Sequence, residues 1–434
     1  MDESHTAFPM HGWPQYVSVE AAGYSAARLQ GVSRFCEEIG SAALLILHDG
    51  VVLHAWGDLL RRFECRSIRK SYLSALFGIY WDRGVIELDK RLAELGIDDE
   101  PPLTPAEREA TVHDLLSARS GVYHLAAYEG PVKKPERGSH PAGSRWLYNN
   151  WDFNTLYTIF EQETGQSPFD AFRREIARPL GMSRLRQNDS CTFFEPERSQ
   201  HPAYLFRTCA LDMARFGLLY LRQGRWRDQQ ILSKEWVTQS TSNQSLPGEE
   251  GYGYMWWVPR LEGGLARFAE LGLFEASGTG GQKITILPEE KLVVVHLCDT
   301  YRSEAFVGKK YWELLDKILG AKNGDYSKTP KLMPFQVQTD WQFNQRASVE
   351  VLLPYTGKYE LAPNLYVDVE LIGEQIFLSI EPTHFPPTVV LSNRKGGFVL
   401  EDIGIELSFQ KYENDLIIEM VSSSGKVWSG SLVG

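Results

Sequence analysis

The sequence contains few cysteines, and their placement does not suggest a covalent framework. The chain of 434 residues has five, an odd number, and no two of them form a C-x-x-C pair. They are Cys36, Cys65, Cys191, Cys209 and Cys298. Scattered cysteines of this kind are typical of reduced thiols, because disulfide frameworks and zinc sites use closely spaced sets.

Positive charge and long apolar segments are also scarce. The chain carries 45 Lys and Arg residues against 56 Asp and Glu residues, a formal net charge of -11. This balance argues against a nucleic acid or an anionic membrane as a partner. No apolar run is long enough to span a bilayer, and the N-terminus lacks the basic and apolar regions of a signal peptide. We therefore expect a cytoplasmic protein.

Several common catalytic motifs are absent. The sequence has no G-x-S-x-G turn, no H-E-x-x-H zinc motif, no G-x-x-x-x-G-K-[ST] phosphate loop and no glycine fingerprint of a dinucleotide-binding fold. Any catalytic site must therefore be built from another arrangement of residues.

The composition is that of a packed globular protein. Hydrophobic residues make up 43% of the chain and include 12 Trp, 19 Tyr and 21 Phe, enough for a large core. Residues 42–55 form two short apolar runs joined by Asp49-Gly50, the pattern of a β-hairpin. Helical patterns dominate about residues 85–245. Strand patterns return after them, in residues 251–258, 282–288 and 291–300.

The C-terminal part of the chain has a different pattern. Residues 336–348 are largely polar, which predicts a linker. Residues 349–434 contain short alternating runs separated by glycine and Asn-Asp turns, which predicts a small antiparallel β-barrel or sandwich.

One S-x-x-K sequence stands at the head of a predicted buried helix. It runs from Ser67 to Lys70 and precedes the largely apolar segment YLSALFGIYW. Residues three apart share a helix face, so the Lys70 amine can reach the Ser67 hydroxyl. Burial disfavours the charged ammonium and lowers the lysine pKa, which would let Lys70 accept the serine proton. By itself the motif is more often an N-cap serine beside a surface lysine.

Two other stretches match the same motif. Ser392–Lys395 and Ser423–Lys426 lie in predicted turns of the C-terminal β region. A turn does not hold the two side chains in a fixed register, so we attribute both matches to chance.

Tyr148, Asn149 and Asn150 form a second element, within the segment PAGSRWLYNNWDFN. A phenol beside a serine and a lysine can relay the proton to a leaving group. An amide two residues later can bond both Lys70 and a substrate carbonyl. Taken alone, this segment is equally consistent with an aromatic-rich loop between two helices.

A third element, Ser277-Gly278-Thr279-Gly280-Gly281-Gln282, leads into a predicted strand. Glycines at this place allow a substrate to approach a strand edge closely. The backbone N–H of Gln282, together with that of Ser67, is a candidate oxyanion hole. A glycine-rich turn before a strand is, in isolation, more often only a turn.

The three elements in this order resemble the serine β-lactamase and penicillin-binding protein superfamily. The branch they resemble most is that of class C β-lactamase-related esterases, peptidases and 6-aminohexanoate-dimer hydrolases. The resemblance covers about residues 14–315 and includes the phrases TVHDLLSARSG, RPLGM and ALDMARFGLLYLRQG. It implies an α+β fold in residues 1–335: a β-lactamase-like antiparallel sheet flanked by helices, with residues 85–245 inserted as a helical lobe.

The resemblance also implies roles for individual residues. Ser67 would be the nucleophile, Lys70 and Tyr148 the general base and acid in an order left open, and Asn150 a substrate-orienting amide. Substrate contacts are expected at Thr279, Gly280, Gly281 and Gln282. The implied activity is that of a serine hydrolase acting on a small-molecule ester or amide through an acyl-enzyme, with no metal and no organic cofactor.

One departure from the family pattern affects the expected specificity. The third motif is usually Lys or His, any residue and Gly, whereas the matching triplet is Thr279-Gly280-Gly281 and carries no cation. Esters and uncharged amides are therefore favoured over β-lactams, unless Arg207 of the helical lobe supplies a cation from another direction. The alternatives are a penicillin-recognising binding protein, or a D-amino-acid peptidase or β-lactamase with slow or no turnover.

The C-terminal segment, with PYTGKYEL, resembles the lipocalin-like β-barrel domain appended to some members of the superfamily. Such a domain would be a lid, a contact for homo-oligomer formation, or a passive appendage.

Overall fold

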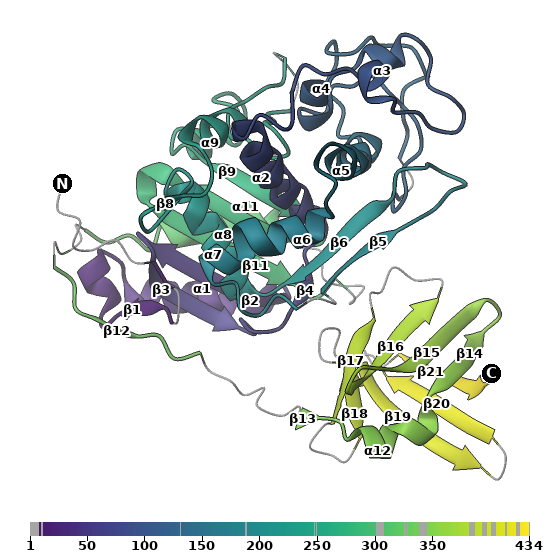
Figure 1. Ribbon diagram of the computed structural model, residues 1–434. Coiled ribbons are helices and arrows are strands. Elements are labelled where there is room, and N and C mark those ends of the chain that lie inside the picture. Colours follow the sequence, from purple (N-terminus) through teal and green to yellow (C-terminus); the bar gives the residue numbers. More distant parts are fainter. Residues whose placement is uncertain are drawn as a thin grey trace.

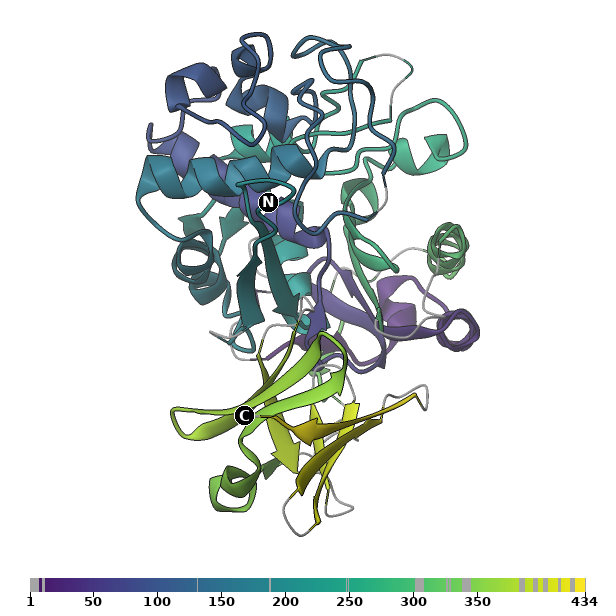
Figure 2. The same cartoon turned by 90° about the vertical axis from the view of Figure 1, so that its right-hand side faces the viewer.

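A computed structural model shows two units (Figures 1 and 2), a larger one of sheet and helices and a smaller all-β one that ends the chain. The structure describes residues 8–9, 12–130, 132–186, 189–246, 248, 250–300, 308–324, 327, 329–337, 345–381, 387–392, 397–400, 405–412, 415–421 and 426–433.

A seven-stranded sheet organises the larger unit. In spatial order its strands are β12 (Leu332–Pro334), β1 (Pro14–Tyr16), β3 (Val51–Gly57), β2 (Ser41–His48), β11 (Leu292–Cys298), β10 (Gln282–Leu287) and β9 (Phe274–Gly278). The sheet is antiparallel, as the sequence suggested, except that β1 runs parallel to β3. The sheet brings the two ends of this unit together.

Helices cover both faces of the sheet (Figure 1). Leu44 of β2 packs in a core with side chains of α1 and α11, and its neighbour Leu45 packs in a second core with side chains of α2 and α8. These helices are α1 (Ala26–Glu38), α11 (Lys310–Leu319), α2 (Ile68–Asp82) and α8 (Ala210–Leu221). Because strand side chains alternate, a strand buried on both faces has an unbroken apolar sequence, as β2 does.

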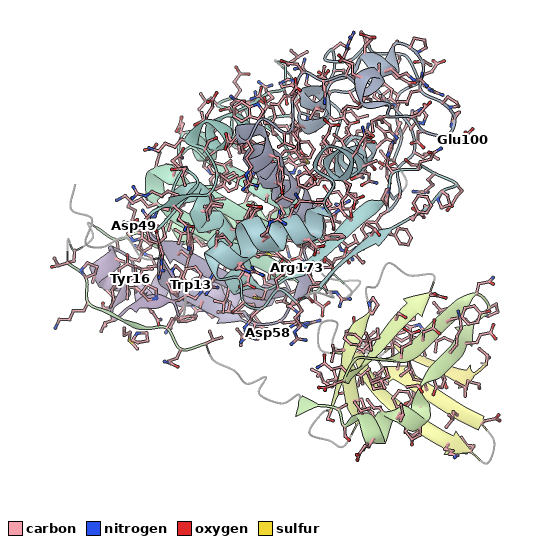
Figure 3. All side chains as sticks on the ribbon, viewed as in Figure 1. Trp13, Tyr16, Asp49, Asp58, Glu100 and Arg173 are labelled. Carbon is pink, nitrogen blue, oxygen red and sulfur yellow. The ribbon has the colours of Figure 1, made fainter. Side chains whose placement is uncertain are left out.

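The predicted hairpin and the predicted buried helix are both confirmed. β2 and β3 pair around Asp49 and Gly50, which have φ of 50° and 82° (Asp49 is labelled in Figure 3). Asp and Gly tolerate these left-handed values better than other residues. α2 begins directly after Ser67 and is buried along nearly its whole length.

The lobe inserted between β3 and β9 is mainly helical but also contains strands. Its helices are α3 (Leu92–Leu95), α4 (Val112–Leu116), α5 (Asn150–Thr164), α6 (Pro168–Phe172), α7 (Arg178–Leu180), α9 (Lys234–Ser240) and α10 (Ala266–Ala269), with a π-helical turn at Arg173–Ala177. Its strands are β4 (Phe63–Glu64), β5 (Ser190–Phe193), β6 (Ala203–Thr208), β7 (Arg225–Trp226) and β8 (Gln229–Gln230). The order β4-β6-β5 forms a small sheet beside α2.

The prediction of a strand over residues 251–258 is wrong. The segment makes only isolated bridges, Tyr252 with Trp257 and Trp257 with Glu275. Met255 has φ of 60°, outside the extended region, and its N–H donates to Leu116 O at 3.1 Å. The aromatic residues that suggested a strand are buried by packing against the helical lobe instead.

The smaller unit is a closed antiparallel barrel, as predicted. Its strands are β14 (Gly357–Ala362), β15 (Leu365–Ile372), β16 (Gln375–Glu381), β17 (Thr388–Ser392), β18 (Phe398–Leu400), β19 (Ile405–Tyr412), β20 (Asp415–Val421) and β21 (Val427–Leu432). Pairing of β14 with β21 and of β17 with β18 closes the ring around an apolar core.

The expected linker lies partly outside the described residues. Residues 338–344 of it are not described, whereas β13 (Gln345–Arg346) already pairs with β17, and α12 (Val349–Leu352) follows. A buried hydrogen bond joins the units: Arg207 Nη1 on β6 donates to Thr388 Oγ1 on β17 at 2.7 Å.

Candidate active site

Ser67 lies where β4 passes into α2. The Cys65 N–H donates to Phe206 O of β6 at 2.9 Å, which anchors the chain before the turn. Arg66 then has φ of 51°, a conformation that is strained for a residue with a Cβ. Ser67 has helical φ and ψ, and its hydroxyl caps no backbone N–H of the helix. The serine side chain is therefore free for other hydrogen bonds.

Polar contacts hold Arg66 in its left-handed conformation. Its Nη1 lies 3.2 Å from Glu64 Oε1 and also contacts the Tyr128 hydroxyl, and its Nε donates to Thr300 Oγ1 at 3.3 Å. The Tyr128 hydroxyl donates to Glu64 Oε1 at 2.6 Å. Strained backbone persists where its surroundings fix it in this way, and it is concentrated at functional sites.

Lys70 lies one helical turn after Ser67, on the same face. Its Nζ is 2.9 Å from Ser67 Oγ, within hydrogen-bond distance. The residue is only 1% exposed, and this burial holds the Lys70 pKa well below its usual range; the positive charge of Arg69 lowers it further. This lowering of the Lys70 pKa is in the direction that the sequence predicted for a lysine in a buried helix.

Tyr148 completes a triangle with these two residues. Its hydroxyl is close enough to Ser67 for hydrogen bonding to lower the Tyr148 pKa, and its ring centroid lies 5.0 Å from Lys70 Nζ. The ring stacks on Trp257 with centroids 5.4 Å apart and planes inclined by 19°. Burial raises the Tyr148 pKa, although the bond to Ser67 opposes that shift. The phenol therefore retains its proton near neutral pH and can donate it.

Asn150 begins α5 close to this triangle but has a different partner. Its Nδ2 donates to Glu129 Oε1 at 3.3 Å, and no hydrogen bond joins it to Lys70 among the described residues. Lys134 Nζ lies 3.0 Å from Glu129 Oε2, which fixes that buried carboxylate. Glu129 is near enough to Lys70 that its negative charge raises the Lys70 pKa, against the effect of burial.

A cavity of about 300 Å³ opens over the serine hydroxyl. Ser67, Tyr148 and Trp257 line it, together with the loop 277–281 that joins β9 to β10. Thr279, Gly280 and Gly281 thus line the same cavity as Ser67, as the sequence suggested. Gly280 and Gly281 have φ of 85° and 99°, which favours glycine at both positions.

Gln282 lies away from that cavity. It is fully buried, and its side chain is bonded to the backbone of Cys298, with Oε1 accepting from N at 3.0 Å and Nε2 donating to O at 2.8 Å. These two bonds tie the start of β10 to β11. The side chain of Gln282 is therefore occupied within the protein and does not face a substrate.

The close approach of the edge strand to the nucleophile occurs at Gly278. A Cβ on this residue would lie 2.6 Å from Cys65 O and 2.9 Å from Arg66 Cβ. The residue two positions earlier, Ala276, points into the core that contains α2. The glycine that packs against the nucleophile segment is therefore earlier in the chain than the triplet Thr279-Gly280-Gly281 chosen from the sequence.

The cation suggested at Arg207 is engaged elsewhere. The side chain is 1% exposed and bonds Thr388 of the barrel. Of the two other S-x-x-K matches, Ser392 ends β17, while residues 393–395 and 423–425 lie outside the described part of the chain.

Four residues near the site were not singled out from the sequence. They are Arg66, Arg69, Glu129 and Lys283. Arg69 had one usable signal, since it occupies a variable position of the S-x-x-K motif at the head of an apolar helix. Its guanidinium lies 4.9 Å above the ring of Tyr204, and its Nε has no hydrogen-bond partner among the described residues.

The described part of the chain offers no group of three or more His, Cys, Asp or Glu side chains placed to hold a metal ion. In the same residues, no helix combines the length and apolarity needed to cross a bilayer.

Comparisons with known proteins place this geometry in context. A family model described as Beta-lactamase matches residues 32–317. Among solved structures, the octameric penicillin-binding protein homologue from Pyrococcus abyssi aligns with a TM-score of 0.51 and 18% identity, over 94% of this chain and 100% of that one. The hydrolase EstCE1, which has promiscuous acyltransferase activity, aligns with a TM-score of 0.51 and 18% identity, over 69% and 100%.

A penicillin-binding protein from Bacillus halodurans aligns with a TM-score of 0.51 and 14% identity, over 67% of this chain and 99% of that one. At these identities the structural likeness establishes the fold alone. A search of curated protein sequences finds no match.

Proposed function

Because the chain belongs to the β-lactamase family, as the sequence resemblance implied, we propose that it is a serine hydrolase that cleaves ester or amide bonds of small substrates through an acyl-enzyme on Ser67. The observation that carries this proposal is the 2.9 Å distance between Ser67 Oγ and Lys70 Nζ, together with the burial that lowers the Lys70 pKa. A serine hydroxyl is a weak nucleophile until a nearby base can take its proton.

The chemistry proceeds in two halves. Lys70 Nζ, with Tyr148 in the same hydrogen-bonded set, takes the proton as Ser67 Oγ attacks the substrate carbonyl. The tetrahedral intermediate then collapses to the acyl-enzyme, and the leaving group departs with a proton delivered through the Tyr148 hydroxyl. Water adds to the acyl-enzyme by the reverse sequence of proton transfers, which releases the acid and restores Ser67.

Two backbone N–H groups would stabilise the oxyanion. One is that of Ser67. We assign the other to Thr279 in place of Gln282, because Thr279 borders the cavity directly after Gly278, whereas Gln282 is fully buried. Donors fixed in position before the reaction stabilise the developing negative charge at little reorganisation cost.

Uncharged esters and amides suit this site better than β-lactams. The strand position two residues before Gly278 is occupied by Ala276, and the residue after it is Thr279, so β9 presents no cation next to the scissile carbonyl. A carboxylate-bearing substrate would have only neutral donors there, and charge-assisted hydrogen bonds are about twice as strong as neutral ones.

Covalent labelling tests the nucleophile. A fluorophosphonate probe followed by mass mapping should modify the peptide that contains Ser67, and Ser67→Ala should abolish both labelling and hydrolysis of p-nitrophenyl butyrate. Its melting temperature should remain close to that of the wild-type protein, because the hydroxyl caps no helix N–H. Label on Ser392 or Ser423, or full activity in Ser67→Ala, would overturn the proposal.

The alternative is a penicillin-recognising protein that captures an acyl group without turnover. The intact set of Ser67, Lys70 and Tyr148 argues against a site without chemistry, whereas a trap would use the same groups for acylation and differ only in lacking deacylation. With p-nitrophenyl acetate, steady release of p-nitrophenol identifies an enzyme, and a single stoichiometric burst identifies a trap.

A further inference from the structure

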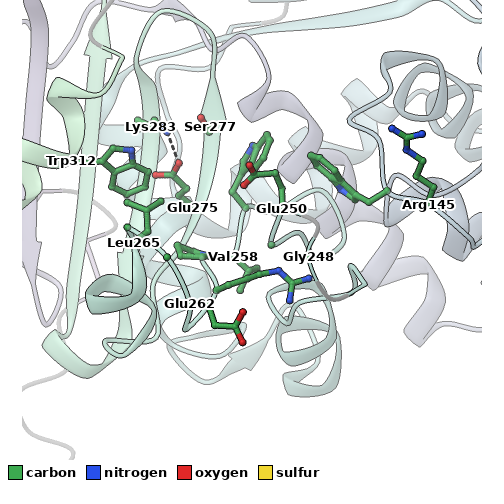
Figure 4. A pocket seen from close by; sticks show the side chains of 17 residues that line it. Arg145, Gly248, Glu250, Val258, Glu262, Leu265, Glu275, Ser277, Lys283 and Trp312 are labelled. Atoms are coloured by element: carbon green, nitrogen blue, oxygen red, sulfur yellow. Dashed lines mark hydrogen bonds and ion pairs between the residues drawn. The ribbon is translucent and has the colours of Figure 1, made fainter. Parts of the chain in front are cut away.

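A second, larger cavity adjoins the one over Ser67. It has a volume of about 890 Å³ and shares Trp257, Ser277 and Lys283 with the smaller cavity. The two cavities therefore adjoin at these three residues, and the larger one extends to Trp312 of α11 (Figure 4). Cavities of roughly 300–1,000 Å³ bury drug-sized ligands, so the combined space exceeds the needs of a short acyl group.

The charged side chains of the larger cavity are mostly satisfied by partners within the protein. Lys283 Nζ is ion-paired with Glu275 Oε1, and Glu275 Oε2 accepts from Thr285 Oγ1 at 3.1 Å. Arg260 donates to the carbonyl oxygens of Ser245 and Leu246. A charge that already has its partners offers little to a ligand, and desolvating it again is costly.

Three further charged residues, Arg145, Glu250 and Glu262, also line the cavity and are exposed to solvent, while most of the remaining lining side chains are apolar or aromatic. Trp146, Trp257 and Trp312 line the cavity together with Val258 and Leu265. Trp257 also stacks on the catalytic Tyr148, so the aromatic wall begins at the reacting centre. Trp312 and Leu265 lie together beside the Glu275–Lys283 pair (Figure 4). Apolar side chains therefore also line the cavity on the side of α11.

We propose that this larger cavity, called here the tryptophan channel, binds a long apolar acyl or alcohol substituent of the substrate. The inference rests on the proposed serine hydrolase function and specifies its substrate class: esters or amides with an extended hydrocarbon or aromatic substituent. Each methylene group transferred from water into such a channel should raise kcat/KM by about fourfold until the channel is full.

The chain offers a variant that blocks the channel with little risk to the fold. Gly264 lines it, and a Cβ on Gly264 meets no atom within 4 Å. Gly264→Phe should therefore fill the space without strain. Gly31→Phe is the matched control, because Gly31 lies on α1, outside both cavities, and its Cβ would meet only Arg34 Nη2 at 3.7 Å. Trp312→Ala removes one wall instead of filling the space.

The experiment compares kcat/KM in two series. The acyl chain is varied in p-nitrophenyl acetate, butyrate and octanoate, and the alcohol is varied in ethyl and octyl acetate, whose hydrolysis is measured by the release of acid. We expect wild type and Gly31→Phe to show at least a tenfold rise from the short to the long substituent in one series, which is a small part of the roughly 4,000-fold full transfer effect of the six methylenes that separate them. Gly264→Phe and Trp312→Ala should lose most of that rise while hydrolysing p-nitrophenyl acetate at nearly the wild-type rate.

Two results would overturn the inference. Either both series are flat in the wild-type protein, or the rise persists unchanged in Gly264→Phe, which would place the long substituent outside the channel. Failure of the proposed hydrolase function is distinguishable, because it would appear as no turnover of p-nitrophenyl acetate in any variant.

Discussion

At the scale of single residues, two opposite charges compete for the protonation state of Lys70. Burial is the largest cause of its lowered pKa; Arg69 lowers that pKa further and Glu129 raises it. Lys70 accepts a proton only while it is neutral, so activity should fall as the pH drops below the Lys70 pKa. The acid limb of the pH–rate profile therefore reports the Lys70 environment.

This competition predicts opposite shifts in two variants. Arg69→Gln removes the neighbouring cation, so the Lys70 pKa rises and the acid limb of kcat/KM moves to higher pH. Glu129→Gln removes the neighbouring anion, so the same limb moves to lower pH. The measurement is the profile of p-nitrophenyl butyrate hydrolysis for both variants, with circular dichroism to check folding. Shifts in the same direction would contradict this assignment.

Lys70 and Tyr148 should behave as one unit. Lys70→Ala and Tyr148→Phe each remove a proton-transfer group and are expected to lower kcat by about 10²–10⁴-fold. Because both groups are proposed to exchange a proton with the Ser67 hydroxyl, the double variant should be little slower than the worse single variant. A double variant slowed by the product of the two single effects would mean that the groups act independently.

The lack of a strand cation predicts a substrate preference. The wild-type protein should hydrolyse p-nitrophenyl butyrate with kcat/KM at least about tenfold above that for nitrocefin, because the nitrocefin carboxylate would find only neutral donors on β9. Faster turnover of nitrocefin would show that another group, such as Lys283 at the junction of the two cavities, receives the carboxylate.

At the scale of elements, the contact of β9 with the segment before α2 sets the position of the nucleophile. Gly278→Ala would bring a methyl group to 2.6 Å from Cys65 O, so the strand or the turn must shift. We expect a loss of stability of about 1–3 kcal/mol and a larger proportional loss of kcat. Gly12→Ala is the matched control, since its Cβ meets no atom within 4 Å and Gly12 lies outside both cavities. Unfolding midpoints and p-nitrophenyl butyrate kinetics measure both effects.

Elements encoded by local pattern could be predicted from the sequence. The β2–β3 hairpin follows from Asp49-Gly50 between apolar runs, and α2 follows from the long apolar segment after Ser67. The segment 251–258 could not be predicted correctly, because its aromatic residues are buried by the helical lobe rather than by strand partners. The strands β4, β5 and β6 were not anticipated, because they are short and β4 pairs with β6, a segment far from it in the sequence.

In the candidate site, too, contacts within one element could be predicted and contacts between distant segments could not. Ser67 and Lys70 could be found because their contact spans one helical turn, and the structure brings Tyr148 to both. Among the glycines at 278, 280 and 281, however, no local signal tells which one packs against Cys65, since that depends on the fold of distant segments. The hydrogen bond from Asn150 to Glu129 could not be predicted either, because Glu129 belongs to no recognisable sequence motif.

At the scale of the whole molecule, Arg207 and Thr388 join the barrel to the hydrolase unit. Thr388→Val would leave a buried guanidinium without this acceptor, at a cost of about 1–3 kcal/mol. Thr388→Ser keeps the hydroxyl and serves as the control. Thermal unfolding should show an earlier transition in Thr388→Val than in Thr388→Ser or wild type. Identical transitions in all three proteins would mean that this bond contributes little to the stability of the assembled chain.

The order of strands in the large sheet has a consequence for synthesis of the protein. β2 pairs on one side with β3 and on the other with β11, and β1 pairs with β12 near residue 334. While the chain emerges from the ribosome, Ser67 and Lys70 appear early, but the central strand β2 has an open edge until the whole helical lobe has followed. The nascent chain thus spends most of its translation with Ser67 and Lys70 already made and the sheet that supports them incomplete. Ribosome-bound chains stalled before residue 292 should accordingly be inactive and depend on chaperones.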